Sequence, residues 1–374
     1  MTAAKKALTL RPGSGQRNSA FTSRLILARA LDLGLRPVVA GRSPAKVAEL
    51  AQAHGLAHAA ASVDDADALA RMLAGKSLVL NAAGPFGETA IPVMEACLRT
   101  GTHYADIGGD VSVLQKQLPL AEAFRQAGIA AVLAVGFDVV PTDYAAKWAA
   151  LIQGSEPADE LQLGLSLPVN MSRGSLRALV DDLHRGTLIL RQGVLQRVRP
   201  LAHTAVFDYG RGPAVSLANT WGDLLTAPLT TGIQNVAVYF EATPAVRQAA
   251  RLSELLAWPA QWRGVRALLK RLVRFLPEGP DDCLRASQQA TIVAHSLRRG
   301  AVVRKVRIHT GDPYQFTAFS VAKAVGRLLA APQPAGMHSP ASVLGDDFLA
   351  GLPGVAIEPV LQDGVVTGAG VGAG

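Results

Sequence analysis

A glycine-rich stretch follows the first apolar run of the chain and reads G-x-G-x-x-N from Gly13 to Asn18. Glycine lets a backbone approach a phosphate group closely, and the free N–H groups of a following helix bind anions. Gly13 and Gly15 are therefore candidates for holding the pyrophosphate of a dinucleotide. The third glycine of the dinucleotide pattern is missing, so an ordinary turn is the competing interpretation.

Two basic residues follow the second apolar run. They are Arg42, within the stretch AGRS at 40–43, and Lys46. In a dinucleotide fold this strand end contacts the ribose of the adenosine half, and an acid here binds the 2′-hydroxyl of NAD. An arginine suits the 2′-phosphate of NADP instead. Arg42, Ser43 and Lys46 thus predict a site that prefers NADP, with NAD as the second choice. A solvated arginine after a strand is the alternative.

A loop of small residues follows the next apolar run and spans residues 81–87, NAAGPFG. Small residues let the backbone pass close to a nicotinamide ribose. The predicted cofactor contacts in this loop are Asn81, Ala83, Gly84, Pro85 and Phe86. A plain strand-to-helix turn is the alternative.

Ionisable residues gather after two further runs, at 102–110 (THYADIGGD) and 136–143 (GFDVVPTD). Sites in open α/β sheets form at such strand ends. Tyr104, Asp106 and Asp138 are the candidate catalytic residues, because side chains of these types orient substrates and relay protons. An aspartate in a strand-end turn also caps backbone N–H groups, and this structural role is the alternative.

These stretches lie at the ends of a repeated strand and helix pattern, as expected for βαβ units. The predicted strands are Ala7–Leu10, Arg36–Ala40, Ser77–Asn81 and Ala130–Val135. The predicted helices are Thr22–Leu33, Pro44–His54 and Thr89–Thr100, with Gly34, Gly55 and Gly101 just past their ends as caps. Thr142 or Asp143 suits the cap of a further helix.

The pattern predicts an α/β protein with a Rossmann-type doubly wound parallel sheet and a second α+β domain. Alternating segments at Leu161–Leu167 and Val302–His309 indicate a mixed or antiparallel sheet in that second domain. The expected divisions are a dinucleotide-binding domain at 1–150, a substrate domain at 151–360 and a flexible glycine-rich tail at 361–374.

The composition excludes several classes of protein. The 374 residues are 49% hydrophobic and 18% charged, and their mean hydropathy is +0.22, which excludes a disordered chain. The longest apolar stretch, Ile129 to Phe137, is far shorter than the roughly 20 residues of a membrane span. Cys97 and Cys283 offer neither a disulfide framework nor metal-ligand spacing, so no metal is expected.

The net charge of +8 is spread along the chain without interleaved aromatic residues, which argues against nucleic acid as a partner. Residues 1–6 contain no secretory signal, so a cytoplasmic location is expected. One segment concentrates basic residues: Arg263–Leu276 has the period of an amphipathic helix. It either packs on its own domain or lies in an anionic membrane interface, which would make the protein peripheral at a membrane.

Several motifs resemble the saccharopine dehydrogenase-like NAD(P)-binding proteins. Those before residue 150 are NAAGPF at 81–86, EAC at 95–97, GTHYAD at 101–106 and GFDVVPTD at 136–143. Those after it are RGS at 173–175, WGDL at 221–224, AP at 227–228, TTGI at 230–233, TA at 317–318, SPA at 339–341 and LPGV at 352–355. The nearest branch is the trans-acting enoyl reductases associated with lipid and glycolipid synthesis.

The phosphate turn departs from this family, which reads G-A-T-G-[FY]-T-G. The equivalent stretch, residues 17–23, reads RNSAFTS and keeps only Phe21 and Thr22, which are carried over as cofactor contacts. Two explanations stay open. Either Gly13 and Gly15 take over the turn, or the N-terminal segment has been altered, for example by a shifted reading frame, and cofactor affinity is impaired.

The resemblance implies an NADP-dependent reductase of an apolar, lipid-related enoyl substrate, with the nicotinamide beside Gly84–Phe86. A saccharopine-type amino acid dehydrogenase is one alternative, for which Arg173 is the motif-borne cation that would bind the substrate. His184 is a further candidate proton donor. A non-catalytic, membrane-peripheral protein with a degenerate cofactor site is the other alternative.

Overall fold

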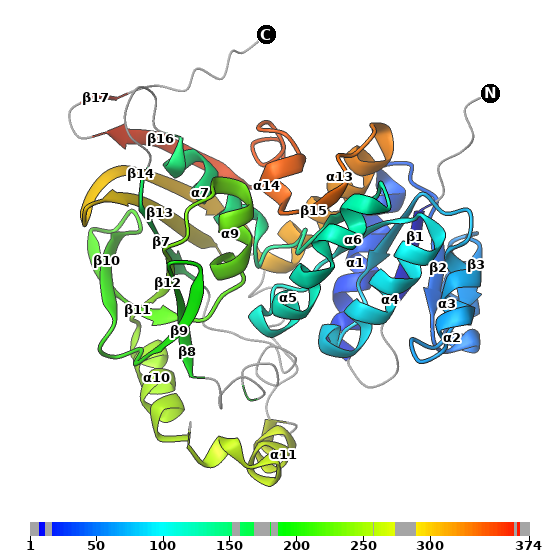
Figure 1. The fold of residues 1–374 in the computed structure, drawn as a ribbon, viewed down its shortest axis with the longest axis horizontal. Coiled ribbons are helices and arrows are strands. Elements are labelled where there is room, and N and C mark those ends of the chain that lie inside the picture. Colours follow the sequence, from blue (N-terminus) through cyan, green and yellow to red (C-terminus); the bar gives the residue numbers. More distant parts are fainter. Residues whose placement is uncertain are drawn as a thin grey trace. The chain divides into compact units, whose positions relative to one another are not determined.

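The chain forms two compact units in the computed structural model (Figure 1). Unit 1 comprises Met1–Val140 and Tyr314–Leu352, and unit 2 comprises Pro141–Pro313 and Pro353–Gly374. The residues that the structure describes are 7–11, 17–151, 158–167, 180, 186–256, 258–273, 289–362 and 365–366.

This division differs from the consecutive domains expected at 1–150 and 151–360. Unit 1 ends ten residues earlier along the first part of the chain, and a late segment, Tyr314–Leu352, returns to it. The reason is strand pairing: β15 (Gly336–His338) pairs in parallel with β6 (Ala130–Val132). Of the predicted flexible tail, 361–362 belong to a strand and 365–366 form another, while the remainder lies outside the described residues.

Unit 1 contains a seven-stranded sheet whose pairs are all parallel. Its order is β15-β6-β5-β4-β1-β2-β3, and its pairings are parallel throughout. β2 and β3 follow on one side of β1, and β4, β5 and β6 follow on its other side, so the strand order reverses between β1 and β4. The crevice at the carboxyl ends of the strands at such a reversal is the ligand-binding place of doubly wound sheets. The predicted Rossmann-type sheet is confirmed. Its other strands are β1 (Ala7–Arg11), β2 (Val38–Gly41), β3 (His58–Ala60), β4 (Leu78–Asn81) and β5 (His103–Asp106).

Helices connect these strands. The three predicted helices end within about one residue of the predicted ends, whereas α1 begins at Arg17 and α4 at Phe86, before the predicted Thr22 and Thr89. Gly34, Gly55 and Gly101 adopt positive φ angles of 74°, 60° and 68° just after α1, α2 and α4, as predicted for glycine caps. The helices and short turns of unit 1 are α1 (Arg17–Asp32), α2 (Pro44–Ala53), α3 (Ala66–Leu73), α4 (Phe86–Thr100), α5 (Val111–Gln117), η1 (Leu118–Leu120), α6 (Ala121–Gln126), α13 (Pro313–Ala330) and α14 (Pro340–Val343).

Unit 2 contains a mixed sheet of ten strands, as expected from its alternating segments. Strands β10-β11-β12-β7-β13-β14-β16-β17 follow one another, and the hairpin β8–β9 joins at β12. Only the β12–β7 pair is parallel among the described pairings of this sheet. The strands are β7 (Glu160–Ser166), β8 (Thr187–Arg191), β9 (Val194–Val198), β10 (Thr204–Asp208), β11 (Pro213–Asn219), β12 (Val236–Glu241), β13 (Ala290–Arg298), β14 (Ala301–Thr310), β16 (Ala356–Gln362) and β17 (Val365–Val366).

The described helices of this part of the chain are α7 (Val140–Ala150), α9 (Asp223–Thr231), α10 (Pro244–Leu256) and α11 (Arg263–Leu272), with a short turn η3 (Pro259–Gln261). Within the described ranges, no helix has the length and apolar character that crossing a membrane requires.

Two residues predicted as helix caps are used in tertiary contacts instead. Thr142 and Asp143 lie inside α7 and are completely buried. The Thr142 hydroxyl donates to Asp223 Oδ2 at 2.7 Å, and the Thr230 hydroxyl donates to Asp143. The motif residues of α7 and α9 therefore hold these two helices together in unit 2.

Candidate functional site

The loops after β4, β5 and β6 meet at the carboxyl edge of the unit 1 sheet. Gly108 lies against the ring of Phe86, where a Cβ atom would stand 2.9 Å from Phe86 Cγ. Gly109 lies against Asp138, where a Cβ atom would stand 2.6 Å from Asp138 Cβ. The two glycines of the 102–110 stretch are thus required for close approach of three loops, and all three carry predicted site residues.

Replacing Gly109 by Ala is expected to lower the free energy of unfolding by about 1–3 kcal/mol, because the new methyl overlaps the Asp138 Cβ atom and a loop must shift. Urea denaturation followed by circular dichroism measures this change. Gly87→Ala is the matched control, since a Cβ there meets no atom within 4 Å and alanine favours the helix. Equal stability of both variants and the parent protein would contradict the close packing of the loops.

Asn81 organises the loop predicted to border the nicotinamide. Its side chain is fully buried, its Oδ1 accepts a bond from the Ala83 N–H at 3.1 Å, and its Nδ2 donates to Thr89 Oγ1 at 3.2 Å. The Thr89 hydroxyl in turn donates to the Ala83 carbonyl at 2.6 Å. The Gly84–Pro85 peptide is cis. Asn81 therefore shapes the loop from within, and Gly84 to Phe86 form its outer part.

Tyr104 and Asp106 form a buried hydrogen-bond network without exposed surface. The Tyr104 hydroxyl donates to Asp106 Oδ2 at 2.8 Å, and Gln117 Nε2 donates to the same oxygen at 2.6 Å. The Ala134 N–H donates to Asp106 Oδ1 at 2.8 Å. Burial raises the pKa of both Asp106 and Tyr104. In this conformation neither side chain can touch a substrate, and the network ties the loop after β6 to β5.

Asp138 is the predicted catalytic residue that keeps exposed surface. Within the described residues its carboxyl group forms no hydrogen bond or ion pair. Protein nevertheless surrounds it closely: desolvation, followed by the neighbouring Asp110 carboxylate, raises the pKa of Asp138 from 3.8 to about 7. A carboxyl group of this pKa exchanges a proton near neutral pH, which suits general acid catalysis.

Two residues outside the predicted site hold the loop of Asp138 in place. The Phe137 N–H donates to Thr317 Oγ1 at 3.1 Å, and the Ser320 hydroxyl donates to the Val135 carbonyl at 2.9 Å. Both partners lie on α13, about 180 residues further along the chain. Thr317 is part of the TA motif at 317–318. This motif is the feature of the sequence that points to Thr317.

Arg42 and Lys46 are exposed at the carboxyl end of β2 and the start of α2. Neither forms an ion pair or hydrogen bond with a described residue. Ser43 is the N-cap residue of α2, yet its side chain makes no capping bond. Two cations and a hydroxyl without competing acids among the described residues fit the 2′-phosphate of NADP.

The phosphate turn itself falls on Gly13 and Gly15, which lie outside the described residues, as does the side chain of Phe21. In the sequence both glycines stand between the last residue of β1, Arg11, and the first residue of α1, Arg17. Ser23, which replaces the last glycine of the family pattern, is buried and donates to the Ala82 carbonyl at 3.3 Å. A hydroxyl bond here joins α1 to the loop after β4.

The remaining candidates are Arg173 and His184, which lie outside the described residues, together with Cys283. Cys97 is fully buried, and burial raises the pKa of its thiol. Among the described residues, no three His, Cys, Asp or Glu side chains are grouped so as to hold a metal ion.

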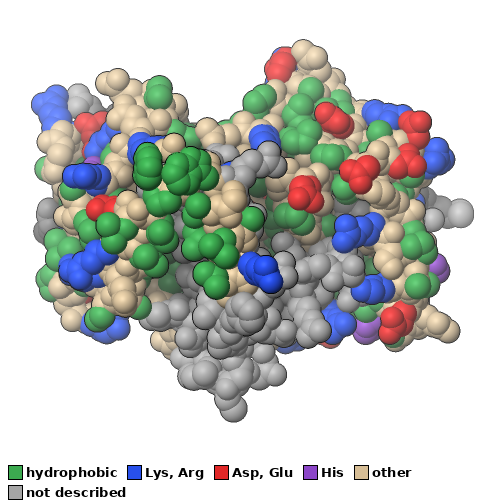
Figure 2. All heavy atoms as spheres, turned by 90° about the horizontal axis from the view of Figure 1, so that it is seen from below, with side chains coloured by type: hydrophobic (Ala, Val, Ile, Leu, Met, Phe, Trp, Pro, Cys, Tyr) green, Lys and Arg blue, Asp and Glu red, His purple; other side chains and the backbone are tan. Residues whose placement is uncertain are grey.

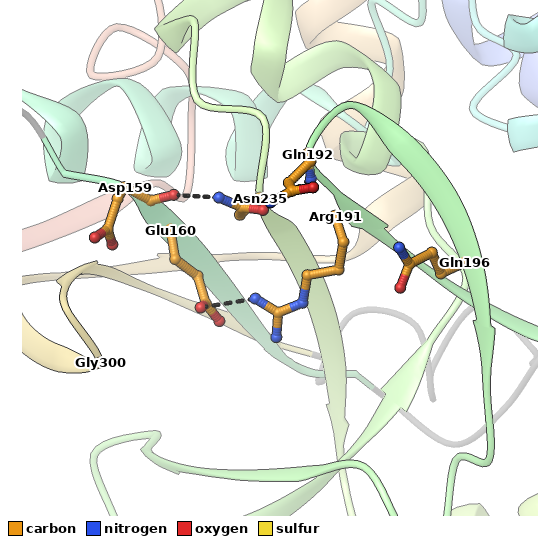
Figure 3. Close-up of a pocket in the computed structure, with 7 residues that line it drawn as sticks. All are labelled: Asp159, Glu160, Arg191, Gln192, Gln196, Asn235 and Gly300. Atoms are coloured by element: carbon orange, nitrogen blue, oxygen red, sulfur yellow. Dashed lines mark hydrogen bonds and ion pairs between the residues drawn. The ribbon is translucent and has the colours of Figure 1, made fainter.

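A separate pocket of about 600 Å³ opens on unit 2 and is polar (Figure 3). Arg191 pairs with Glu160 at 2.9 Å, and Asn235 Nδ2 donates to the Asp159 carbonyl at 2.8 Å. Figure 3 shows the two pairs: Glu160 of β7 with Arg191 of β8, and Asp159 with Asn235, which stand just before β7 and β12. This polar lining differs in character from the apolar, lipid-related substrate that the resemblance implies.

The sequence is similar to a known family model and to several known proteins. Residues 19–132 match the family model of the saccharopine dehydrogenase NADP binding domain. A trans-acting enoyl reductase of Mycobacterium leprae is 38% identical over 73 residues, which cover 19% of this chain and 18% of that protein. A protein of Arabidopsis thaliana named as a mitochondrial saccharopine dehydrogenase-like oxidoreductase is 27% identical over 142 residues, which cover 33% of this chain and 31% of that protein. The aligned segments thus span less than a third of either relative.

The fold is shared more widely than the sequence. The structure of apo saccharopine dehydrogenase (L-Glu forming) from Saccharomyces cerevisiae matches with a TM-score of 0.56 at 16% identity, over 91% of this chain and 94% of that one. At this identity the likeness concerns the fold. Residues 19–132 are therefore similar to the NADP binding domain of saccharopine dehydrogenase, and the chain shares its fold with a saccharopine dehydrogenase.

Proposed function

We propose that the protein is an NADP-dependent reductase that acts on an apolar, lipid-related enoyl substrate. The observation that carries the cofactor half of this proposal is the pair of exposed cations, Arg42 and Lys46, which stand at the end of β2 without acidic partners among the described residues. The match of residues 19–132 to an NADP-binding domain supports it.

The cofactor would lie along the carboxyl edge of the unit 1 sheet. Arg42, Ser43 and Lys46 would hold the 2′-phosphate, and the loop from Ala83 to Phe86 would border the nicotinamide ribose. Gly13 and Gly15 stay the candidates for the pyrophosphate, with Thr22 in the second turn of α1. When bound, NADPH supplies the hydride for the reduction of a double bond.

Asp138 would supply the proton that a reduced enoyl carbon requires. Asp138 keeps exposed surface, and it stands near Phe86, since Gly108 contacts Phe86 and Gly109 contacts Asp138. At pH values below about 7 it carries a proton. Tyr104 and Asp106 would act as positioning residues, because they fix the backbone on both sides of this loop without surface of their own.

The substrate class rests on the relatives, several of which are named trans-acting enoyl reductases. Stopped-flow or steady-state oxidation of NADPH with an acyl enoyl thioester tests it directly. Saccharopine with NADP as oxidant is the parallel assay for the amino acid alternative. Turnover of saccharopine but not of the enoyl thioester would contradict the proposed substrate. The assignment as an oxidoreductase would remain.

Arg42→Ala is expected to weaken NADPH binding about 10- to 100-fold while changing NADH binding little, because a charge-assisted bond to the 2′-phosphate is lost. Isothermal titration calorimetry with both cofactors measures the two constants. Arg71→Ala is the control, since Arg71 is exposed in the last turn of α3, at the opposite edge of the sheet. Equal losses for the two cofactors would show that Arg42 does not meet the 2′-phosphate.

A further inference from the structure

Three consecutive elements of unit 2, α10, η3 and α11, carry large apolar side chains that keep more than half of their surface exposed. Figure 2 shows hydrophobic side chains gathered over these elements with Lys and Arg side chains beside them. We call this surface the α10–α11 face. Its apolar members, with the exposed fraction of each, are Leu252 (54%), Leu255 (75%), Trp258 (67%), Trp262 (59%), Leu268 (58%) and Leu272 (53%).

The apolar residues of α11 divide into an inner and an outer row. Val273 is buried, and Val265 and Leu269 are half-buried, so these three at i, i+4 and i+8 form the inner row of one helix face. Leu268 and Leu272 form the outer row and lie in solvent. Two of the five large apolar residues on this face of the helix are therefore left in solvent.

The two tryptophans form the centre of the α10–α11 face. Their rings meet at 5.2 Å in an edge-to-face arrangement, and each keeps more than half of its surface exposed. Tryptophan has an apolar ring and one N–H donor, and it is enriched at the boundary between lipid and water. Folded proteins rarely leave two adjacent tryptophans in solvent without a binding partner.

The charge around this face has one sign. Segment 244–273 contains six basic residues and one acid, Glu254. The Glu254 carboxylate accepts a bond from the Leu201 N–H at 3.4 Å and so is directed to a neighbouring turn of its own unit. The basic residues are Arg247, Arg251, Arg263, Arg266, Lys270 and Arg271.

From this combination we infer that the α10–α11 face docks on the surface of an anionic lipid bilayer, with the tryptophans and outer leucines in the interface and the basic residues at the headgroups. The helices are too short to span a bilayer, which leaves an interfacial arrangement. A second copy of the chain is disfavoured, because a symmetric contact would set the cations with described side chains, Arg247, Arg251, Arg266 and Arg271, against their own copies. This inference goes beyond the proposed reductase and does not depend on it.

Sedimentation with vesicles tests the inference on the full chain. The parent protein is expected to pellet with phosphatidylcholine vesicles that contain phosphatidylglycerol, and to stay in solution with phosphatidylcholine alone. Arg266→Glu with Arg271→Glu should lower the partition coefficient more than about 20-fold, because each basic residue near an anionic surface contributes roughly five-fold. Trp258→Ser with Trp262→Ser should lower it by at least a similar factor.

Matched controls use exposed residues of the same kinds elsewhere. Arg71→Glu with Lys116→Glu repeats the charge change on unit 1, and Val206→Ser with Val215→Ser removes two exposed apolar side chains from β10 and β11. Both controls should pellet within about two-fold of the parent protein, as expected of sites that do not meet lipid. NADPH binding should be unchanged in every variant. This measurement separates failure of the membrane-docking inference from failure of the proposed reductase function.

Three results would overturn the inference. The first is the absence of the parent protein from the pellet with anionic vesicles, and the second is equal pelleting of parent and face variants. The third is a dimer by light scattering that becomes a monomer in the tryptophan variant, since a second copy would then cover the face. Quenching of Trp258 and Trp262 fluorescence by brominated lipid would support the docking directly.

Discussion

Asp138→Asn is expected to lower kcat/KM for the enoyl substrate by about 10²- to 10⁴-fold, the range that a lost general acid produces. The side chain keeps its size, and its carboxyl group has no hydrogen bond to lose among the described residues. NADPH affinity should stay within about two-fold of the parent protein, because a proton donor to the substrate contributes to the reaction and not to cofactor binding.

The pH dependence gives the sharper test of this role. In the parent protein kcat/KM should fall as the pH rises through about 7, where the Asp138 carboxyl loses its proton. In Asp138→Asn this fall should be absent. A variant that retains full activity, or that keeps the same pH profile, would remove Asp138 from the mechanism.

The ionisation of Asp138 is also expected to make the stability of the folded protein depend on pH. The pKa of Asp138 lies near 7 in the folded protein and at 3.8 as an unperturbed group, so the folded state holds a proton that the unfolded state releases. The contribution of this proton to the stability of the folded state is therefore complete below about pH 4, and it is lost as the pH rises towards 7. Asp138→Asn should melt at a higher temperature than the parent at pH 8 and show no such gain at acidic pH.

Asp106→Ala is expected to lower the free energy of unfolding by about 3–5 kcal/mol, because four donors lose the buried carboxyl group that accepts their hydrogen bonds. The donors are the N–H groups of Ala134 and Gly108, the Tyr104 hydroxyl and the Gln117 amide. Urea denaturation measures the change. Asp32→Ala, at an exposed ion pair with Arg29 on α1, is the control and should cost less than about 1 kcal/mol.

Asp106→Asn separates a structural role from a catalytic one. The Oε1 atom of Gln117 is buried and has no partner among the described residues, so a turn of the Gln117 amide would let it accept a bond from the new side-chain amide. We expect this variant to recover more than half of the stability that alanine loses and to keep kcat/KM within about ten-fold, because the loop stays in place. A loss of activity as large as that of Asp138→Asn, with stability retained, would give Asp106 a direct part in the reaction.

The parallel architecture of unit 1 and the positions of its chemistry-bearing loops follow from the amino-acid sequence. Buried apolar runs with glycines after each helix give βαβ units almost regardless of the rest of the chain, because parallel strands are buried on both faces. The ends of these strands share one edge, so the strand pattern is enough to assign Arg42, Phe86, Asp106 and Asp138 to one region. The basic amphipathic helix at 263–272 is equally visible from its period.

Which of these side chains face solvent depends on how distant segments pack. Tyr104 and Asp106 have the same chemical types as site residues, yet they are enclosed by Gln117 and the loop after β6, whereas Asp138 stays exposed. Helix α13 reaches back to the Asp138 loop through Thr317, and β15 adds a strand to the sheet that begins with β1. A local sequence pattern contains the period of a helix or a strand, and it does not contain the partners that close around it.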